Sequence, residues 1–189
     1  MTPTSYDPLY GPLSALIGTW TGDHGLDVAP EPDGSEESPY YETIVFEGIG
    51  DAENAEDQVL GVVRYLQIVR RKSNDEVFHD QTGYWMWDAR AKTVMQSLTI
   101  PRGVCVLAGG QHSGEVDPRS PTTLRVRATL GDETFGIIQS PYMLENAKTV
   151  AFEHELIVGP DSLRYSETTH LSIYGRDFDH TDANELRRA

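Results

Sequence analysis

Histidines are the side chains in this sequence best suited to acid–base or metal chemistry, and two of the six stand out. His154 lies in an alternating run over residues 148–159, on the same side as apolar residues. It is interpreted either as a core histidine bonded to a neighbouring hydroxyl or carbonyl, or as a polar group in a ligand cavity. His180 lies in the acidic segment 177–182. A neutral imidazole with nearby carboxylates suits a metal ion, and the other interpretation is a capped turn near the terminus.

The other four histidines give weaker signals. His24 follows a Trp-containing motif and is expected to be exposed in a loop. His79 is placed on a strand, and His112 is expected to face solvent in a Gly-rich loop. His170 shares the polar face of its strand and is expected to point outward.

Familiar catalytic signatures are absent from the sequence, which contains no Walker loop, Gly-x-Ser-x-Gly, His-Glu-x-x-His or Gly-x-Gly-x-x-Gly. The carboxylates are scattered and are expected to be solvated. Cys105 is the single cysteine, so an internal disulfide or a Cys-based zinc site is excluded. Its valine neighbours predict a buried small hydrophobe. Any chemistry would therefore come from a cofactor or from one or two isolated side chains.

The amino-acid composition excludes some classes of binding partner. The net charge of −15 repels phosphate backbones and anionic headgroups, which argues against nucleic acid and membrane partners. No apolar run approaches the roughly 20 residues needed to span a bilayer. The first nine residues lack the pattern of a signal peptide, and we expect a cytoplasmic protein. The length of 189 residues predicts a single domain over residues 1–189.

The elements that must position these groups are short strands with period-2 alternation. About ten of them predict an all-β fold, an antiparallel up-and-down barrel, with a short helical turn within residues 10–17. Residues 58–71 are assigned to a strand because of their β-branched residues and Gly61. Loops are expected over 27–39, 50–57 and 109–122. The strands are expected within 78–88, 93–100, 103–108, 124–130, 148–159 and 162–175, beside the first strand at Trp20.

Aromatic residues are concentrated enough to line a flat apolar pocket, although barrel core is the simpler interpretation for each one. Trp20 lies in a Gly-x-Trp-x-Gly motif at the start of the first strand. Of Trp85 and Trp87, at least one is expected to face inward with Gly83. The full set is Trp20, Tyr40, Tyr41, Tyr84, Trp85, Trp87 and Tyr165.

Several motifs occur in an order that resembles the nitrobindins, haem-binding β-barrels similar to fatty-acid-binding proteins and other calycin-type barrels. The match begins with Gly18-Thr19-Trp20-Thr21-Gly22 and continues with Tyr41-Glu42-Thr43-Ile44, where the family has proline at the second position. Residues 79–85, 96–106 and 163–165 are similar to later family strands. Residues 180–188 are similar to the segment in which the family carries its axial histidine.

The resemblance implies haem b bound through the metal ligand His180, with Trp20, Tyr41, Thr43 and Ile44 beside the cavity mouth. It also implies handling of nitric oxide or peroxynitrite, and isomerase-like activity if haem is bound. The chain departs from the family in an acidic insertion at about 23–40 and in Thr-Asp after His180. Two alternatives stay open: a haem-free carrier of a small hydrophobic ligand, with His154 in its lining, and a non-binding interaction domain. A homodimer also stays open.

Overall fold

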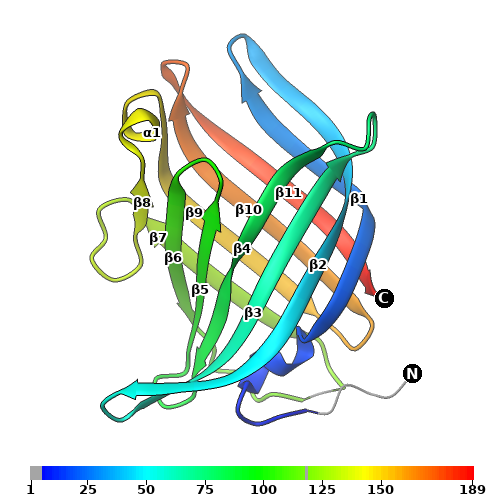
Figure 1. Ribbon diagram of the computed structural model, residues 1–189, viewed down its shortest axis with the longest axis vertical. Coiled ribbons are helices and arrows are strands. Elements are labelled where there is room, and N and C mark those ends of the chain that lie inside the picture. The colour runs from blue at the N-terminus through cyan, green and yellow to red at the C-terminus, as the bar shows by residue number, and fades with distance from the viewer. Residues whose placement is uncertain (1–5, 118) are drawn as a thin grey trace.

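The computed structural model describes residues 6–117 and 119–189, and these form an antiparallel β-barrel (Figure 1). A 3₁₀ turn, η1 (Gly11–Ala15), precedes the first strand, and one short helix, α1 (Pro141–Asn146), precedes β9. The strands are β1 (Gly18–Glu31), β2 (Gly34–Ala55), β3 (Gln58–Arg71), β4 (Val77–Asp88), β5 (Thr93–Ile100), β6 (Val104–Gln111), β7 (Thr122–Thr129), β8 (Ile137–Gln139), β9 (Ala147–Val158), β10 (Ser162–Ile173) and β11 (Arg176–Arg188).

Within the described residues, ten strands close the barrel and β8 is an extra strand, which confirms the expected architecture. Strands adjacent in the chain pair with each other from β1 to β7 and from β9 to β11, β7 pairs with β9, and β1 pairs with β11 to close the barrel. The strands β6 and β7 meet at the single pair Gly109 and Arg127. The short strand β8 pairs with the first residues of β6, where β7 does not pair with it.

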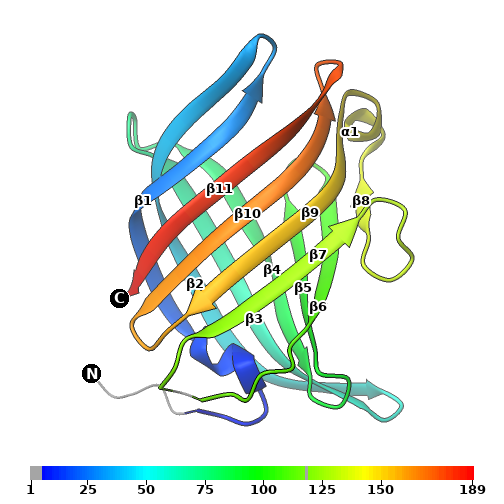
Figure 2. The ribbon, with the colours of Figure 1, turned by 180° about the vertical axis from the view of Figure 1, so that it is seen from behind.

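The acidic segment predicted as a loop over 27–39 is instead a hairpin, so this prediction was wrong. β1 and β2 pair continuously from Asp27 opposite Ser38 to Glu31 opposite Gly34. The turn is Pro32-Asp33, and Pro-Asp-Gly is a strong turn signature. Polar residues form strands here because the hairpin projects beyond the barrel wall, where both of its faces are largely exposed (Figure 2).

Three other expectations are corrected. Most of the predicted loop 50–57 is the paired end of β2, with Ala55 opposite Gln58. The loop predicted from 109 begins later, because β6 continues to Gln111. His180 lies in the middle of β11 and not in a turn, because residues 176–188 pair with β10 along their length. The strand β8 and the helix α1 were not predicted. The N-terminus of α1 is capped by the Ser140 hydroxyl, which accepts from the Met143 N–H at 3.3 Å.

One end of the barrel is closed by η1 and an apolar core. Leu13 and Leu16 are fully buried, and the Trp20 indole N–H donates to the Leu16 carbonyl at 2.7 Å. Arg188 covers the Trp20 ring at 4.1 Å and donates to the Ile17 carbonyl. The turns between β1 and β2, β3 and β4, β5 and β6, and β10 and β11 lie at the opposite end (Figure 1). Any ligand site must therefore be sought at that second end.

Candidate ligand-binding site

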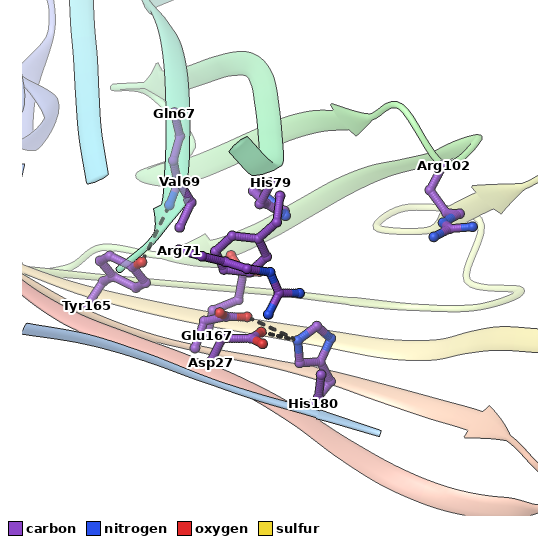
Figure 3. Close-up of a pocket in the computed structure, with 12 residues that line it drawn as sticks. Asp27, Gln67, Val69, Arg71, His79, Arg102, Tyr165, Glu167 and His180 are labelled. Atoms are coloured by element: carbon purple, nitrogen blue, oxygen red, sulfur yellow. Dashed lines mark hydrogen bonds and ion pairs between the residues drawn. The ribbon is translucent and has the colours of Figure 1, made fainter. Parts of the chain in front are cut away.

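The open end of the barrel contains a cavity with two lobes. The larger lobe has a volume of about 920 Å³ and the smaller about 270 Å³. Residues shared by both lobes come from β4, the β5–β6 turn, β10 and β11, and Figure 3 shows the smaller lobe. The shared residues are Phe78, His79, Arg102, Glu167, His180 and Asp182. The volume of the larger lobe lies in the range of small-ligand pockets, which is about 300–1,000 Å³ for typical ligands.

The wall of the larger lobe is mainly apolar because inward-facing residues of four strands are aliphatic or aromatic. Alternation along β5, β6, β9 and β10 turns every second residue toward the interior. These wall residues are Leu98, Ile100, Val104, Val106, Phe152, Leu171 and Ile173. The same alternation turns Cys105 outward, where it is exposed, so the expectation of a buried Cys105 was wrong.

A row of ionisable side chains crosses the interior wall on β1, β11, β10 and β9. Asp27 of β1 pairs with Asp182 of β11, Asp182 pairs with Glu167 of β10, and Glu167 pairs with His154 of β9. Directly opposed residues of antiparallel strands are near neighbours on the same face. Three carboxylates are therefore adjacent, and like charges in this arrangement destabilise a sheet unless they are neutralised.

His180 reaches this row from the next inward position of β11. Its Nε2 donates a hydrogen bond to Asp27 Oδ1 at 2.6 Å (Figure 3). The same Nε2 lies 3.6 Å from Asp182 Oδ2. Burial lowers the pKa of the His180 imidazole, but the hydrogen bond to Asp27 and the charges of Asp182 and Asp27 outweigh burial and raise it. Burial also raises the pKa of Asp182, and the charges of Glu167 and Asp27 add to that increase.

The other end of the row holds a neutral pair. The Glu167 and His154 side chains are 13% and 7% exposed, and His154 Nδ1 lies 3.5 Å from Glu167 Oε2. Burial, assisted by the charge of Glu42, raises the pKa of Glu167 to about 8. Burial lowers the pKa of His154 to about 3. At pH 7 the structure therefore favours an uncharged imidazole beside a protonated carboxyl.

Two hydrogen-bond networks fill the barrel interior between the cavity and the apolar core. In the first, His154 Nδ1 donates to Gln96 Oε1 at 2.9 Å, and Gln96 donates to the Tyr65 hydroxyl at 3.0 Å. Gln81 also donates to Tyr65 and bonds the half-buried His79 at 3.2 Å. Burial lowers the pKa of His79. This network makes His154 a bonded core histidine, as the first of its two interpretations predicted.

The second network surrounds Glu42, which the sequence analysis did not treat as a site residue. Its carboxylate accepts from Gln67 at 2.7 Å, Asn184 at 2.7 Å and the Tyr165 hydroxyl at 2.9 Å. The Tyr165 hydroxyl is also 2.6 Å from that of Tyr40. Burial raises the pKa of Glu42 despite these donors. The alternation Tyr40, Glu42, Ile44 was the signal in the sequence that placed this carboxylate inside.

Tyr40 is buried against a backbone that only glycine permits. A Cβ atom at Gly25 would lie 2.0 Å from the Tyr40 ring. The register of β1 and β2 shifts between Gly22 and Gly25, and this bulge brings Gly25 opposite Tyr40. A side chain at this position would displace the ring and with it the hydrogen bond to Tyr165.

The structure separates the six predicted site residues. His180 lines both lobes, whereas Ile44 and His154 line a separate small void of about 10 Å³. Trp20 is fully buried at the closed end. Tyr41 and Thr43 point to the outer face of β2, because the inward positions belong to Tyr40, Glu42 and Ile44. Tyr41 instead hydrogen-bonds Asp75.

The remaining histidines lie away from the cavity. The His24 side chain is 82% exposed, although it lies in β1 and not in a loop. His170 bonds Asp179 at 2.7 Å on the outer face. The expectation that His112 faces solvent was wrong, since it is half-buried with its ring edge against Trp87 at 6.0 Å. Both Trp85 and Trp87 are buried, as the alternation predicted.

Two arginines give the cavity mouth positive charge. Arg71 and Arg102 line the smaller lobe, and Arg102 also lines the larger one. Arg71 lies over the Phe78 ring at 4.5 Å, donates to Ser38 Oγ at 2.6 Å and is 3.5 Å from Glu36. An anionic group on a ligand would meet these cations at the rim, opposite the carboxylate row.

A closed antiparallel barrel with a partly apolar cavity and a few convergent polar groups defines a small-ligand-binding β-barrel protein. Residues 9–188 match the family model described as THAP4-like, heme-binding beta-barrel domain. The chain belongs to this family, that of the nitrobindins.

A solved structure supports the same fold. The crystal structure of Rv2717c from M. tuberculosis is similar to this chain with a TM-score of 0.71 and 22% sequence identity. The similarity covers 98% of this chain and 99% of that one. A search of curated proteins found no match. In the part of the chain that the structure describes, neither helix has the length and apolarity needed to cross a membrane.

Proposed function

We propose that this protein binds haem b in the cavity at the open end, with His180 as the axial ligand of the iron. The observation that carries this proposal is the position of the His180 ring, whose Nε2–H donates to Asp27 while its side chain lines both lobes. Among the hydrogen bonds of the described residues, none involves His180 Nδ1. A metal-bound histidine ordinarily donates its other ring N–H to a carboxylate or carbonyl, so Nδ1 is the nitrogen available to iron.

The two lobes also provide an apolar wall for the haem ring and cations for its carboxylate groups. The aliphatic and aromatic wall of the larger lobe suits a flat apolar ring system, and its volume of about 920 Å³ is ample. Arg71 and Arg102 at the mouth suit two carboxylate substituents. Bound haem would supply an iron coordination position for a small molecule, for which we propose nitric oxide or peroxynitrite. Isomerase-like activity would follow only from haem binding.

The carboxylates near His180 repel an anionic ligand less than their number suggests. Burial raises the pKa of Glu167 to about 8, so this residue is mainly neutral at pH 7. Burial also raises the pKa of Asp182. Attachment would be noncovalent, because covalent c-type attachment uses a Cys-x-x-Cys-His motif and this sequence has one cysteine, on the outer face.

A hemin titration tests the proposal. We expect the wild-type protein to develop a sharp Soret band at one hemin per chain, and His180→Ala to lose it. His170→Ala is the matched control, because His170 also bonds an aspartate of an adjacent strand, but on the outer face of the barrel. Circular dichroism would verify that each variant is folded. A wild type without a Soret band, or an unchanged band in His180→Ala, would contradict the proposal.

The second candidate is a haem-free carrier of a small hydrophobic ligand, favoured by one observation. His180 and Asp27 hydrogen-bond each other without a metal ion, while the apolar wall of the larger lobe stays accessible. A wild type that binds an apolar fluorescent probe but not hemin would support this carrier. Binding of neither ligand would support the interaction domain. The single domain over residues 1–189, the homodimer and the cytoplasmic location stay predictions.

A further inference from the structure

We propose that His180 Nε2, Asp27 and Asp182 form a binding site for one divalent transition-metal ion, independent of haem. The metal ion would bind the imidazole nitrogen that now bonds Asp27, whereas the haem proposal uses the other nitrogen, Nδ1. Each residue supplies one ligand atom, and the three atoms lie within 4.8 Å of one another. The inference does not rest on haem binding.

The separations of the ligand atoms suit a metal ion. His180 Nε2 is 2.6 Å from Asp27 Oδ1 and 3.6 Å from Asp182 Oδ2. Ligands at the usual distance of about 2.1 Å from an ion lie about 3.0–3.4 Å apart in octahedral or tetrahedral geometry. Small rotations of the side chains would therefore equalise the distances without moving the strands. The ion would replace the proton that His180 and Asp27 now share.

The charge of the surrounding wall supplies an independent argument. Asp27, Asp182 and Glu167 occupy consecutive cross-strand positions, so three carboxylates are adjacent in a half-buried environment. Among the ion pairs of the described residues, those of Asp27 and Asp182 are with His180 alone. One imidazole can balance at most one of the two aspartate charges beside it. A divalent ion would neutralise the Asp27 and Asp182 carboxylates directly and remove their mutual repulsion.

The donor set selects the class of metal. One imidazole and two carboxylates suit Zn²⁺, Mn²⁺, Fe²⁺ or Co²⁺, whereas Mg²⁺ and Ca²⁺ prefer oxygen ligands throughout. Access is available, because the His180 and Asp182 side chains are 29% and 28% exposed and face the cavity. Asp27 is buried and would form the base of the site. The remaining coordination positions would be taken by water from the smaller lobe.

Cobalt(II) is a suitable probe, because its visible absorption reports nitrogen and oxygen ligands directly. The full-length, haem-free protein would be treated with EDTA, dialysed, and titrated with cobalt(II) chloride by absorption and by calorimetry. We expect one ion per chain and a rise in the melting temperature of the wild type. Asp182→Asn should weaken binding more than about 100-fold, since even partners of the ligands contribute about 10–100-fold. Asp27→Asn and His180→Ala should do the same.

Asp179→Asn is the matched control, because it removes the carboxylate of the exposed His170–Asp179 pair and leaves the cavity unchanged. Binding retained in Asp182→Asn, or lost in Asp179→Asn, would overturn the inference. Circular dichroism and thermal unfolding without metal would identify a variant that fails to fold, and the second aspartate variant then provides the test. A wild type that binds hemin but not cobalt refutes this inference alone. One that binds cobalt but not hemin refutes the haem proposal alone.

Discussion

Replacing Glu167 by glutamine is expected to remove a large part of the sensitivity of this barrel to rising pH. The pKa of Glu167 is raised from its ordinary value of 4.5 to about 8 by burial and by the charge of Glu42. Between these values the folded state retains a proton that the unfolded chain has released, so the free energy of unfolding falls as pH rises. Below pH 4.5 both states are protonated, and above pH 8 the penalty is complete.

The magnitude follows from the same two values. Each pKa unit corresponds to about 1.4 kcal/mol. The wild type should therefore lose at most about 5 kcal/mol between pH 4.5 and pH 8 relative to Glu167→Gln. Glutamine keeps the shape of the neutral carboxyl and cannot ionise, so the variant should be the more stable protein at pH 8.

Urea unfolding followed by tryptophan fluorescence measures this difference. Trp20 and Trp85 are buried in the fold and report its loss. The quantity to compare is the free energy of unfolding of the wild type minus that of Glu167→Gln, at half-unit steps from pH 4 to pH 9. Glu153→Gln controls for the loss of one negative charge, because Glu153 is exposed on the adjacent strand β9. Parallel curves for wild type and Glu167→Gln would refute the reasoning.

Two further predictions concern the neighbouring network and the closed end. His154→Phe should remove acid sensitivity, because burial lowers the pKa of His154 from 6.5 to about 3 and stability is lost as pH falls through that window. The free energy of unfolding of the wild type should fall by at most about 5 kcal/mol through this group. An equally steep decrease at acid pH in the variant would contradict the prediction. Arg188→Ala should lower stability by about 2–3 kcal/mol, because its guanidinium donates to the Ala15 and Ile17 carbonyls and covers Trp20. Urea unfolding measures this, and Arg187→Ala, an exposed neighbour, should cost less than about 1 kcal/mol.

Local patterns predicted most of the barrel because strand formation here depends on alternation. Residues 58–71 and 148–159 were assigned correctly from the period of their apolar residues. The hairpin at 27–39 was missed because its strands extend beyond the wall, so they bury little and show no apolar face. The turn of this hairpin was nevertheless predictable from Pro32-Asp33-Gly34.

The position of side chains on a strand decided which predicted residues reach the site. Tyr41 and Thr43 were expected beside the cavity, but the structure turns Glu42 inward instead. Adjacent residues of a strand point to opposite faces, so a motif that contains the right segment includes both inward and outward residues. An inward carboxylate among aromatic neighbours is recognisable from alternation once Tyr40 and Ile44 are assigned to the core.

The sequence by itself determined the strand content, the barrel class and the interior position of His154, whereas the resemblance to the nitrobindins gave His180 as the predicted metal ligand. Only the tertiary structure decided what His180 contacts, since its partner Asp27 is 153 residues away in the chain. It also decided that Asp27, Asp182, Glu167 and His154 form one row. The physical reason is that the register between β1 and β11 exists only when the barrel closes, and closure depends on the packing of all its strands together.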